Sequence, residues 1–62
     1  MIKGLLLLAR LYLKGKAETT DYRVEFTIWD KDYIEINNED TQVLEDLGWR
    51  LTKYDNVHVW DW

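Results

Sequence analysis

The sequence contains no cysteine and no serine, and it has only one histidine, His58. Without cysteine, disulfide bonds and thiolate metal sites are excluded, and nothing indicates an oxidising compartment. Without either residue, the two commonest nucleophiles of covalent catalysis are missing. A single histidine cannot form a structural zinc site without other ligands, and in a strand beside Lys53 it is typical of a structural role. We therefore expect no enzyme, no metal and no cofactor.

Proline is absent, and the three scattered glycines form no glycine-rich phosphate loop. No repeat, linker or low-complexity tract divides the chain, which predicts a single domain over residues 1–62. Long hydrophobic runs are also missing. The apolar run from Leu5 to Ala9 is far shorter than the roughly 20 residues of a membrane span. Because Arg10 follows it without a signal-peptide cleavage site, we expect a soluble cytoplasmic protein with no membrane partner.

Basic residues are few and unevenly placed. Residues 1–17 hold four of them and no acid, which gives a charge of +4. Residues 18–62 hold twelve acids and four basic residues, which gives −8 and a net charge of −4 for the chain. Because affinity for phosphates needs a basic face, this balance argues against direct binding to DNA or RNA.

The clearest secondary-structure pattern runs from Tyr22 to Ile28, where apolar and polar residues alternate with the period of a half-buried strand. Ile34 and Ile36 continue the alternation after residues 30–32, whose polar side chains favour a turn. The pattern predicts a hairpin in which the two segments pair. The turn carboxylates lack the further oxygen ligands of a calcium loop, so we expect no metal there.

Residues 38–47 predict a short helix with Asn38 as N-cap and Gly48 at the C′ position. Glu39 and Asp40 favour the positive end of its dipole. A helix of this length is unstable alone in water, so its apolar face must pack against the rest of the domain. That face consists of Val43, Leu44 and Leu47.

The last segment, residues 49–62, predicts a second hairpin closed by a two-residue loop at 55–56, where Asp and Asn tolerate positive φ. In this register Leu51 faces Trp60, and the indoles gather on one side. A three-residue loop would scatter the tryptophans. Whether Trp60 and Trp62 are core or surface stays open; the preferred arrangement buries Trp60 on Leu51 and leaves Trp62 partly exposed at a fraying end.

Residues 4–14 are compatible with two structures. As a strand, their odd-numbered residues form one apolar face and the basic residues lie opposite. As a helix, they place Lys3, Arg10 and Lys14 on one stripe, and leucine favours helix. A helix apolar nearly all round needs burial on all sides, which so short a chain cannot supply. The strand is therefore preferred, with a long turn through residues 15–21.

These elements predict an α+β fold, with a small antiparallel sheet of about five strands in the order βββαββ and one short helix packed on one face. The alternative is αββαββ, with a helical N-terminus. One short helix covers only part of one sheet face, so apolar and aromatic side chains are expected on the second face. Monomers seldom expose apolar surface on that scale, which indicates an interface with another protein or a second copy.

Seven acids lie between residues 30 and 46, against a single base, Lys31. Glu45 and Asp46 oppose the dipole of the predicted helix, and a residue choice that costs local stability can mark a functional surface. Such an acidic face can dock on a basic groove, whereas the alternative is a solvated face that only confers solubility. The predicted partner-binding residues are Trp29, Asp30, Asp32, Tyr33, Glu35, Glu39, Asp40, Glu45, Asp46, Trp60 and Trp62.

Our functional hypothesis is a small acidic, non-catalytic protein-binding module. Within this class we expect an inhibitor encoded by a phage or mobile element, which blocks the basic, nucleic-acid-binding surface of a host protein in the host cytoplasm. The alternative is a structural homo-oligomer that pairs its aromatic sheet face with a second copy. A base-stacking nucleic-acid binder is a third hypothesis, which the overall charge disfavours.

Overall fold

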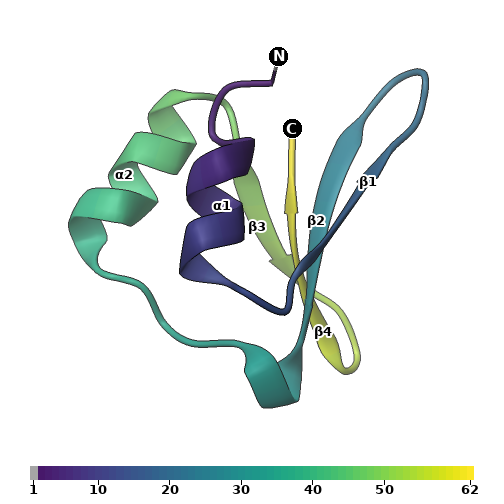
Figure 1. Cartoon of the computed structure of the whole chain (residues 1–62), viewed down its shortest axis with the longest axis vertical. Coiled ribbons are helices and arrows are strands. Elements are labelled where there is room, and N and C mark those ends of the chain that lie inside the picture. Colours follow the sequence, from purple (N-terminus) through teal and green to yellow (C-terminus); the bar gives the residue numbers. More distant parts are fainter. Residues whose placement is uncertain (1) are drawn as a thin grey trace.

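Two strands with apolar residues at alternate positions form the centre of the sheet in the computed structural model, which describes residues 2–62. β2 (Val24–Trp29) buries every second side chain. β4 (Val57–Asp61) pairs with it antiparallel and places Phe26 opposite Trp60. The predicted α+β class with an antiparallel sheet is confirmed (Figure 1).

The two edge strands are short and exposed along their whole length. β1 (Lys16–Thr19) pairs with β2, and β3 (Arg50–Lys53) pairs with β4, so the sheet order is β1-β2-β4-β3. The sheet of residues 2–62 thus has four strands, in place of the expected five or so. β1 lies within residues 15–21, where the sequence predicted only a long turn.

The strand predicted at residues 4–14 is wrong. This segment forms α1 (Leu5–Leu11), so the helical alternative αββαββ gives the observed order. The helix begins after Gly4, whose φ is 95°. Leu8 and Tyr12, one turn apart, are both buried against the sheet. The core face of the sheet is too large for the other helix to cover alone, and α1 covers the rest.

The hairpin predicted through residues 30–32 is also wrong. These residues form one turn of 3₁₀ helix, η1 (Asp30–Asp32), and residues 33–37 form no strand. The backbone N–H of Asp30 donates to the carbonyl of Asn56 at 3.0 Å, which ties the chain to the β3–β4 turn. β4 takes the place beside β2 that Ile34 and Ile36 were expected to fill. Alternation identified β2 as a strand but did not identify its neighbour.

The predicted helix near residues 38–47 is confirmed as α2 (Asn38–Asp46). Its N-cap is one residue earlier than expected, because the side-chain oxygen of Asn37 accepts from the backbone N–H of Asp40 at 2.8 Å. Gly48 follows the helix with a φ of 103°, the left-handed conformation expected at this position.

The C-terminal hairpin has the predicted register. Leu51 lies opposite Trp60, and the backbone N–H of Tyr54 donates to the carbonyl of Val57 at 2.9 Å, which closes a two-residue loop. The loop residues 55–56 do not adopt the positive φ that was expected, since among residues 2–62 only glycines do.

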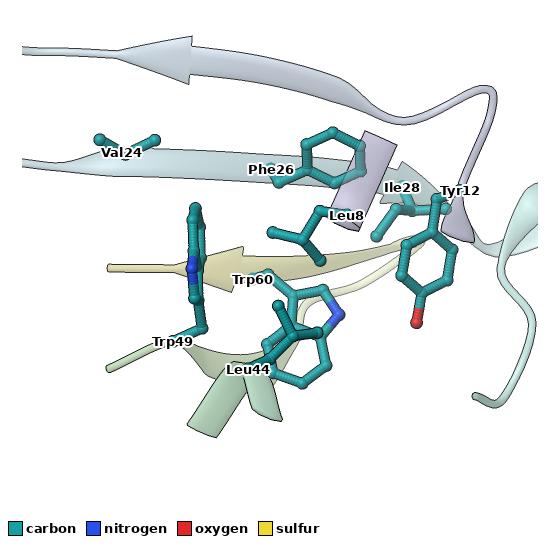
Figure 2. Close-up of a cluster of buried hydrophobic side chains, with 8 residues drawn as sticks. All are labelled: Leu8, Tyr12, Val24, Phe26, Ile28, Leu44, Trp49 and Trp60. Atoms are coloured by element: carbon teal, nitrogen blue, oxygen red, sulfur yellow. The ribbon is translucent and has the colours of Figure 1, made fainter. Parts of the chain in front are cut away.

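Both α-helices pack on the same face of the sheet. Leu8 from α1 and Leu44 from α2 meet the inward side chains of β2 and β4 in one core, and no helix of residues 2–62 lies over the opposite sheet face (Figures 1 and 2). The buried cluster consists of Leu8, Tyr12, Val24, Phe26, Ile28, Leu44, Trp49 and Trp60.

Candidate functional site

The predicted partner-binding residues do not form one surface. Trp60 is 1% exposed and belongs to the core, which leaves it no surface for a partner (Figure 2). Trp29 is exposed on the sheet face that lacks helices. Asp30, Asp32, Tyr33 and Glu35 lie in and after η1. The remaining predicted residues belong to α2 and the chain end, and these are Glu39, Asp40, Glu45, Asp46 and Trp62.

Asp30 fixes η1 to the β3–β4 hairpin. Its carboxylate accepts a hydrogen bond from Lys53 Nζ at 2.8 Å and pairs with His58 Nδ1 at 2.9 Å. The His58 ring stacks on Tyr33 with the centroids 3.6 Å apart, and Tyr33 stacks in turn on the buried Tyr12 at 5.7 Å. Asp30 and Tyr33 are therefore engaged in contacts within the chain.

The hydrogen bond from Lys53, assisted by its charge and by His58, holds the pKa of the Asp30 carboxyl below its usual value. The fold thus favours the ionised carboxylate. A carboxyl of this kind stabilises the fold above its unfolded pKa, and the contribution is lost as the pH falls through the folded pKa. An ionised carboxylate can only accept hydrogen bonds, so the facing Nδ1 of His58 carries the hydrogen.

The Asp30–His58 pair resembles the carboxylate–imidazole contact that orients catalytic histidines. Here the Tyr33 ring stacks on the imidazole, and the chain has neither serine nor cysteine to act as a nucleophile. Across residues 2–62 no cluster of three or more His, Asp or Glu side chains is placed to hold a metal ion. The contacts of the pair are those of a structural link between η1 and β4.

α2 carries acids at both ends. Glu39 and Asp40 in its first turn complement the helix dipole, whereas Glu45 and Asp46 lie near its C-terminus, where the last turn has no basic residue. None of the four forms an ion pair with another residue in the range 2–62. The one side-chain hydrogen bond found there for these carboxylates comes from Gln42 to Asp46, at 2.8 Å. The nearest cation in the hydrogen-bond network is Arg50, whose guanidinium donates to the backbone carbonyl of Glu45 at 3.4 Å and not to a carboxylate of α2.

Trp62 is held against the C-terminal end of α2 and does not fray as expected. Its indole Nε1 donates to the carbonyl of Leu47 at 2.5 Å, and its backbone N–H donates to Val24 at 3.0 Å. Its ring lies 6.4 Å from that of the buried Trp49. Gly48 permits this approach, because a Cβ at that position would lie 2.8 Å from Trp62 Nε1. Half of the tryptophan remains exposed, at 49%.

The uncovered sheet face has one apolar row. Trp29 lies opposite Val57 on the neighbouring strand, and Tyr54 lies on the far side of Val57. Trp29 and Tyr54 are each about half exposed. The next two rows are Thr27–Val59–Thr52 and Glu25–Asp61–Arg50. Because these rows are mainly polar or charged, the exposed apolar area on this face is narrower than the sequence indicated.

Sequence reasoning missed the exposed face of α1. Leu6 is 63% exposed and Leu13 is 87% exposed. An open apolar depression of about 340 Å³ is lined by Ile2, Leu5, Leu6 and Ala9. The same segment exposes three cations that form no ion pair within residues 2–62, and these are Lys3, Arg10 and Lys14. Two features of the sequence could have indicated this surface: the basic stripe that a helix would form here, and the +4 charge of residues 1–17.

Comparison with known proteins gives no relative to assist the interpretation. No protein-family model matches the chain, and no curated protein or solved structure shows significant similarity to it. Neither α-helix within residues 2–62 has the length and apolar character needed to cross a membrane.

Proposed function

We propose that this chain is a non-catalytic protein-binding module that docks the acidic face of α2 on a basic surface of another protein. The observation that carries the proposal is the position of Trp62. Its half-exposed indole donates a hydrogen bond to the carbonyl of Leu47, at the end of α2 that carries Glu45 and Asp46, and its backbone N–H is held by Val24 of β2. A tryptophan already fixed in place loses little conformational freedom on binding, and tryptophan is enriched among residues that dominate binding energy.

The acids of α2 complement this anchor. Glu45 and Asp46 are exposed near the helix end whose dipole disfavours them, and the hydrogen bond from Gln42 to Asp46 is the one side-chain contact within residues 2–62 that offsets this cost. Uncompensated acids increase the rate of encounter with a basic surface and orient the approach. The proposed binding residues are Glu39, Val43 and Asp46 on one side of α2, with Glu45 and Trp62 at its C-terminal end.

The partner would present a basic groove flanked by an apolar pocket for the indole. A groove that normally holds nucleic-acid phosphates has this chemistry, and occupying it would inhibit the partner. We propose on this basis that the chain acts as an inhibitor in the cytoplasm, and in a host cytoplasm if its source is viral.

Pairing of two copies through the sheet face has weaker support. The apolar residues exposed there are confined to the row of Trp29, Val57 and Tyr54, and charged residues follow two rows away. An interface of standard size buries roughly 800 Å² on each partner, with an apolar centre. The single apolar row on the sheet face is too small to form the apolar centre of such an interface.

The test compares the double variant Glu45→Lys/Asp46→Lys with a matched control, Glu18→Lys/Asp21→Lys, which makes the same charge change at exposed positions of the β1–β2 hairpin. Wild type and both variants are immobilised and exposed to a nuclease-treated cell extract. We expect wild type and control to retain a basic protein that the α2 variant does not retain. Added oligonucleotide should release that protein.

Two results would contradict the proposal. In the first, the α2 variant and the control retain the same proteins. In the second, the retained protein stays bound at oligonucleotide concentrations that saturate its nucleic-acid site. Replacing Trp62 with alanine should reduce retention about tenfold or more, because the residue is the proposed anchor.

A further inference from the structure

α1 leaves apolar side chains at the surface that one copy of the chain does not cover. Leu8 and Tyr12 point towards the sheet, so Leu6 and Arg10 lie on the opposite side of the helix and Ala9 lies on its flank. Soluble monomers rarely expose large contiguous apolar patches, and such patches mark sites of interaction. The exposed cations of the same segment give this face a positive charge. Its occupant should therefore be apolar and acidic.

α2 presents the complementary combination. Val43 is 46% exposed, and it lies four residues after Glu39 and three before Asp46, so the three side chains are neighbours on the helix surface. An apolar residue beside two acids on α2 thus matches an apolar depression beside two cations, Lys3 and Arg10, on the α1 segment. Because each copy of the chain carries both surfaces, the α2 face of a second copy can cover the α1 depression of the first, and the reverse contact can form as well.

We propose that the apolar depression on α1 binds the acidic face of α2 from a second copy of this chain. Val43 of the second copy would enter the depression, and Glu39 and Asp46 would approach Lys3 and Arg10. A two-fold axis would form this contact twice, with α1 of each copy against α2 of the other. Both helices pack on the same sheet face, which allows each copy to present the two surfaces together (Figure 1).

An anionic membrane is the competing occupant of a basic apolar surface. It fits less well, because the chain has a net charge of −4 and its acidic regions would be repelled by anionic lipid. α1 also spans only seven residues, which offers little apolar area for insertion. A second copy brings opposite charge to both contacts without this repulsion.

The inference does not rest on the proposed function, although both involve α2. A dimer of this kind would cover the acidic face, so a basic partner would have to displace the second copy. The dimer is measured on the purified chain alone, whereas the proposed function is measured by retention of a partner. Failure of one therefore does not imply failure of the other.

The test is charge reversal on each helix, read as solution mass by sedimentation equilibrium on the full chain. One variant carries Lys3→Glu/Arg10→Glu, and the other carries Glu39→Lys/Asp46→Lys. We expect wild type to dimerise, and each variant alone to associate about tenfold or more weakly, because like charges then meet. An equimolar mixture of the two variants should form a heterodimer with an affinity within about threefold of wild type. Trp29→Lys, on the uncovered sheet face, should leave the dimer unchanged.

Several outcomes would overturn the inference. They are a wild type that stays monomeric up to about 1 mM, a mixture that does not restore association, and a dimer abolished by Trp29→Lys but not by the reversals. Circular dichroism checks that each variant is folded. If a reversed variant is not folded, Leu6→Gln replaces it, and this exposed change should weaken the dimer while the spectrum stays that of wild type.

Discussion

Single glycines decide where the large aromatic residues can lie. Gly48 combines a φ of 103° with close approach of the Trp62 ring, and Gly4 combines a φ of 95° with contact to the Trp49 indole. Trp49 Nε1 also donates to the carbonyl of Lys3 at 2.8 Å, which joins the start of α1 to the end of α2. Both positions require a residue without Cβ, for a conformational and a steric reason together.

Gly48→Ala should lower the free energy of unfolding by roughly 1–3 kcal/mol, because alanine is strained at this φ and its Cβ would crowd Trp62. Urea denaturation measures the change. In a Trp62→Ala background the steric part should disappear and the backbone part, about 1–2 kcal/mol, should remain. An equal effect in both backgrounds would show that Trp62 does not approach Gly48 as described.

Asp30→Asn should reduce stability at neutral pH, because it removes the carboxylate that pairs with Lys53 and His58. The pKa of Asp30 is lowered by folding, so its contribution is present above its unfolded pKa of about 3.9 and is lost as the pH falls through the lower folded value. Unfolding curves of wild type and variant should therefore converge in that acidic range. A difference that persists unchanged well below pH 3.9 would assign the effect to something other than ionisation.

At the scale of elements, the N-terminal segment shows how packing overrides a local pattern. A strand over residues 4–14 would place Leu6 and Leu8 on the same face, since they are two residues apart. In α1 they lie on different sides, with Leu8 buried and Leu6 exposed. The sequence argument required a helix apolar nearly all round to be buried on all sides and therefore rejected it. That requirement is wrong here, because α1 forms with Leu6 exposed.

Leu8→Ala should destabilise the protein by about 2–5 kcal/mol, as expected for a leucine removed from a packed core. Leu6→Ala, at low protein concentration, should change stability by less than about 0.5 kcal/mol. Thermal or urea unfolding of the two variants gives the comparison. Similar losses for both would favour the strand and contradict α1.

The acids near the C-terminus of α2 are expected to cost stability. Glu45→Lys should raise the free energy of unfolding by roughly 0.3–1 kcal/mol, because a cation complements this end of the dipole. Asp46→Lys should raise it by less, because it also removes the hydrogen bond from Gln42. Glu39→Lys, in the first turn, should have the opposite sign. A gain in stability together with a loss of partner retention would be the pattern of a residue kept for function. No gain would mean that these acids have favourable contacts that compensate for the dipole.

At the scale of the whole molecule, two helices cover one sheet face, and a chain of 62 residues buries too little surface to be very stable alone. Association of two copies would add apolar burial that folding of one copy lacks. If the α1–α2 dimer forms, the melting temperature should rise with protein concentration between about 1 μM and 1 mM, because mass action favours the associated native state. The variant Lys3→Glu/Arg10→Glu, which associates more weakly, should show a smaller rise over the same range. A concentration-independent wild type would contradict the dimer.

Local sequence determined those parts of the fold whose residues lie close together in the chain. The register of β3 and β4 follows from a two-residue loop and the match of Leu51 with Trp60. α2 follows from its cap, its apolar face and Gly48. The acidic character of α2 was also visible in the sequence. The position of Trp62 was not, because the residues that bind it, Val24 and Leu47, are distant from it in the chain.

Only the tertiary structure decided the neighbour of β2 and the form of residues 4–14. An alternation of apolar and polar residues identifies a strand but does not show which strand pairs with it. β4 pairs with β2 in preference to a segment nearer in the chain because the two strands form apolar pairs, such as Phe26 with Trp60. Leucine-rich residues 5–11 can be helix or strand, and the need to cover the core face of that sheet selects the helix. The basic apolar surface of α1 follows from this choice, because the helix turns Leu6 and Arg10 outward when it turns Leu8 inward.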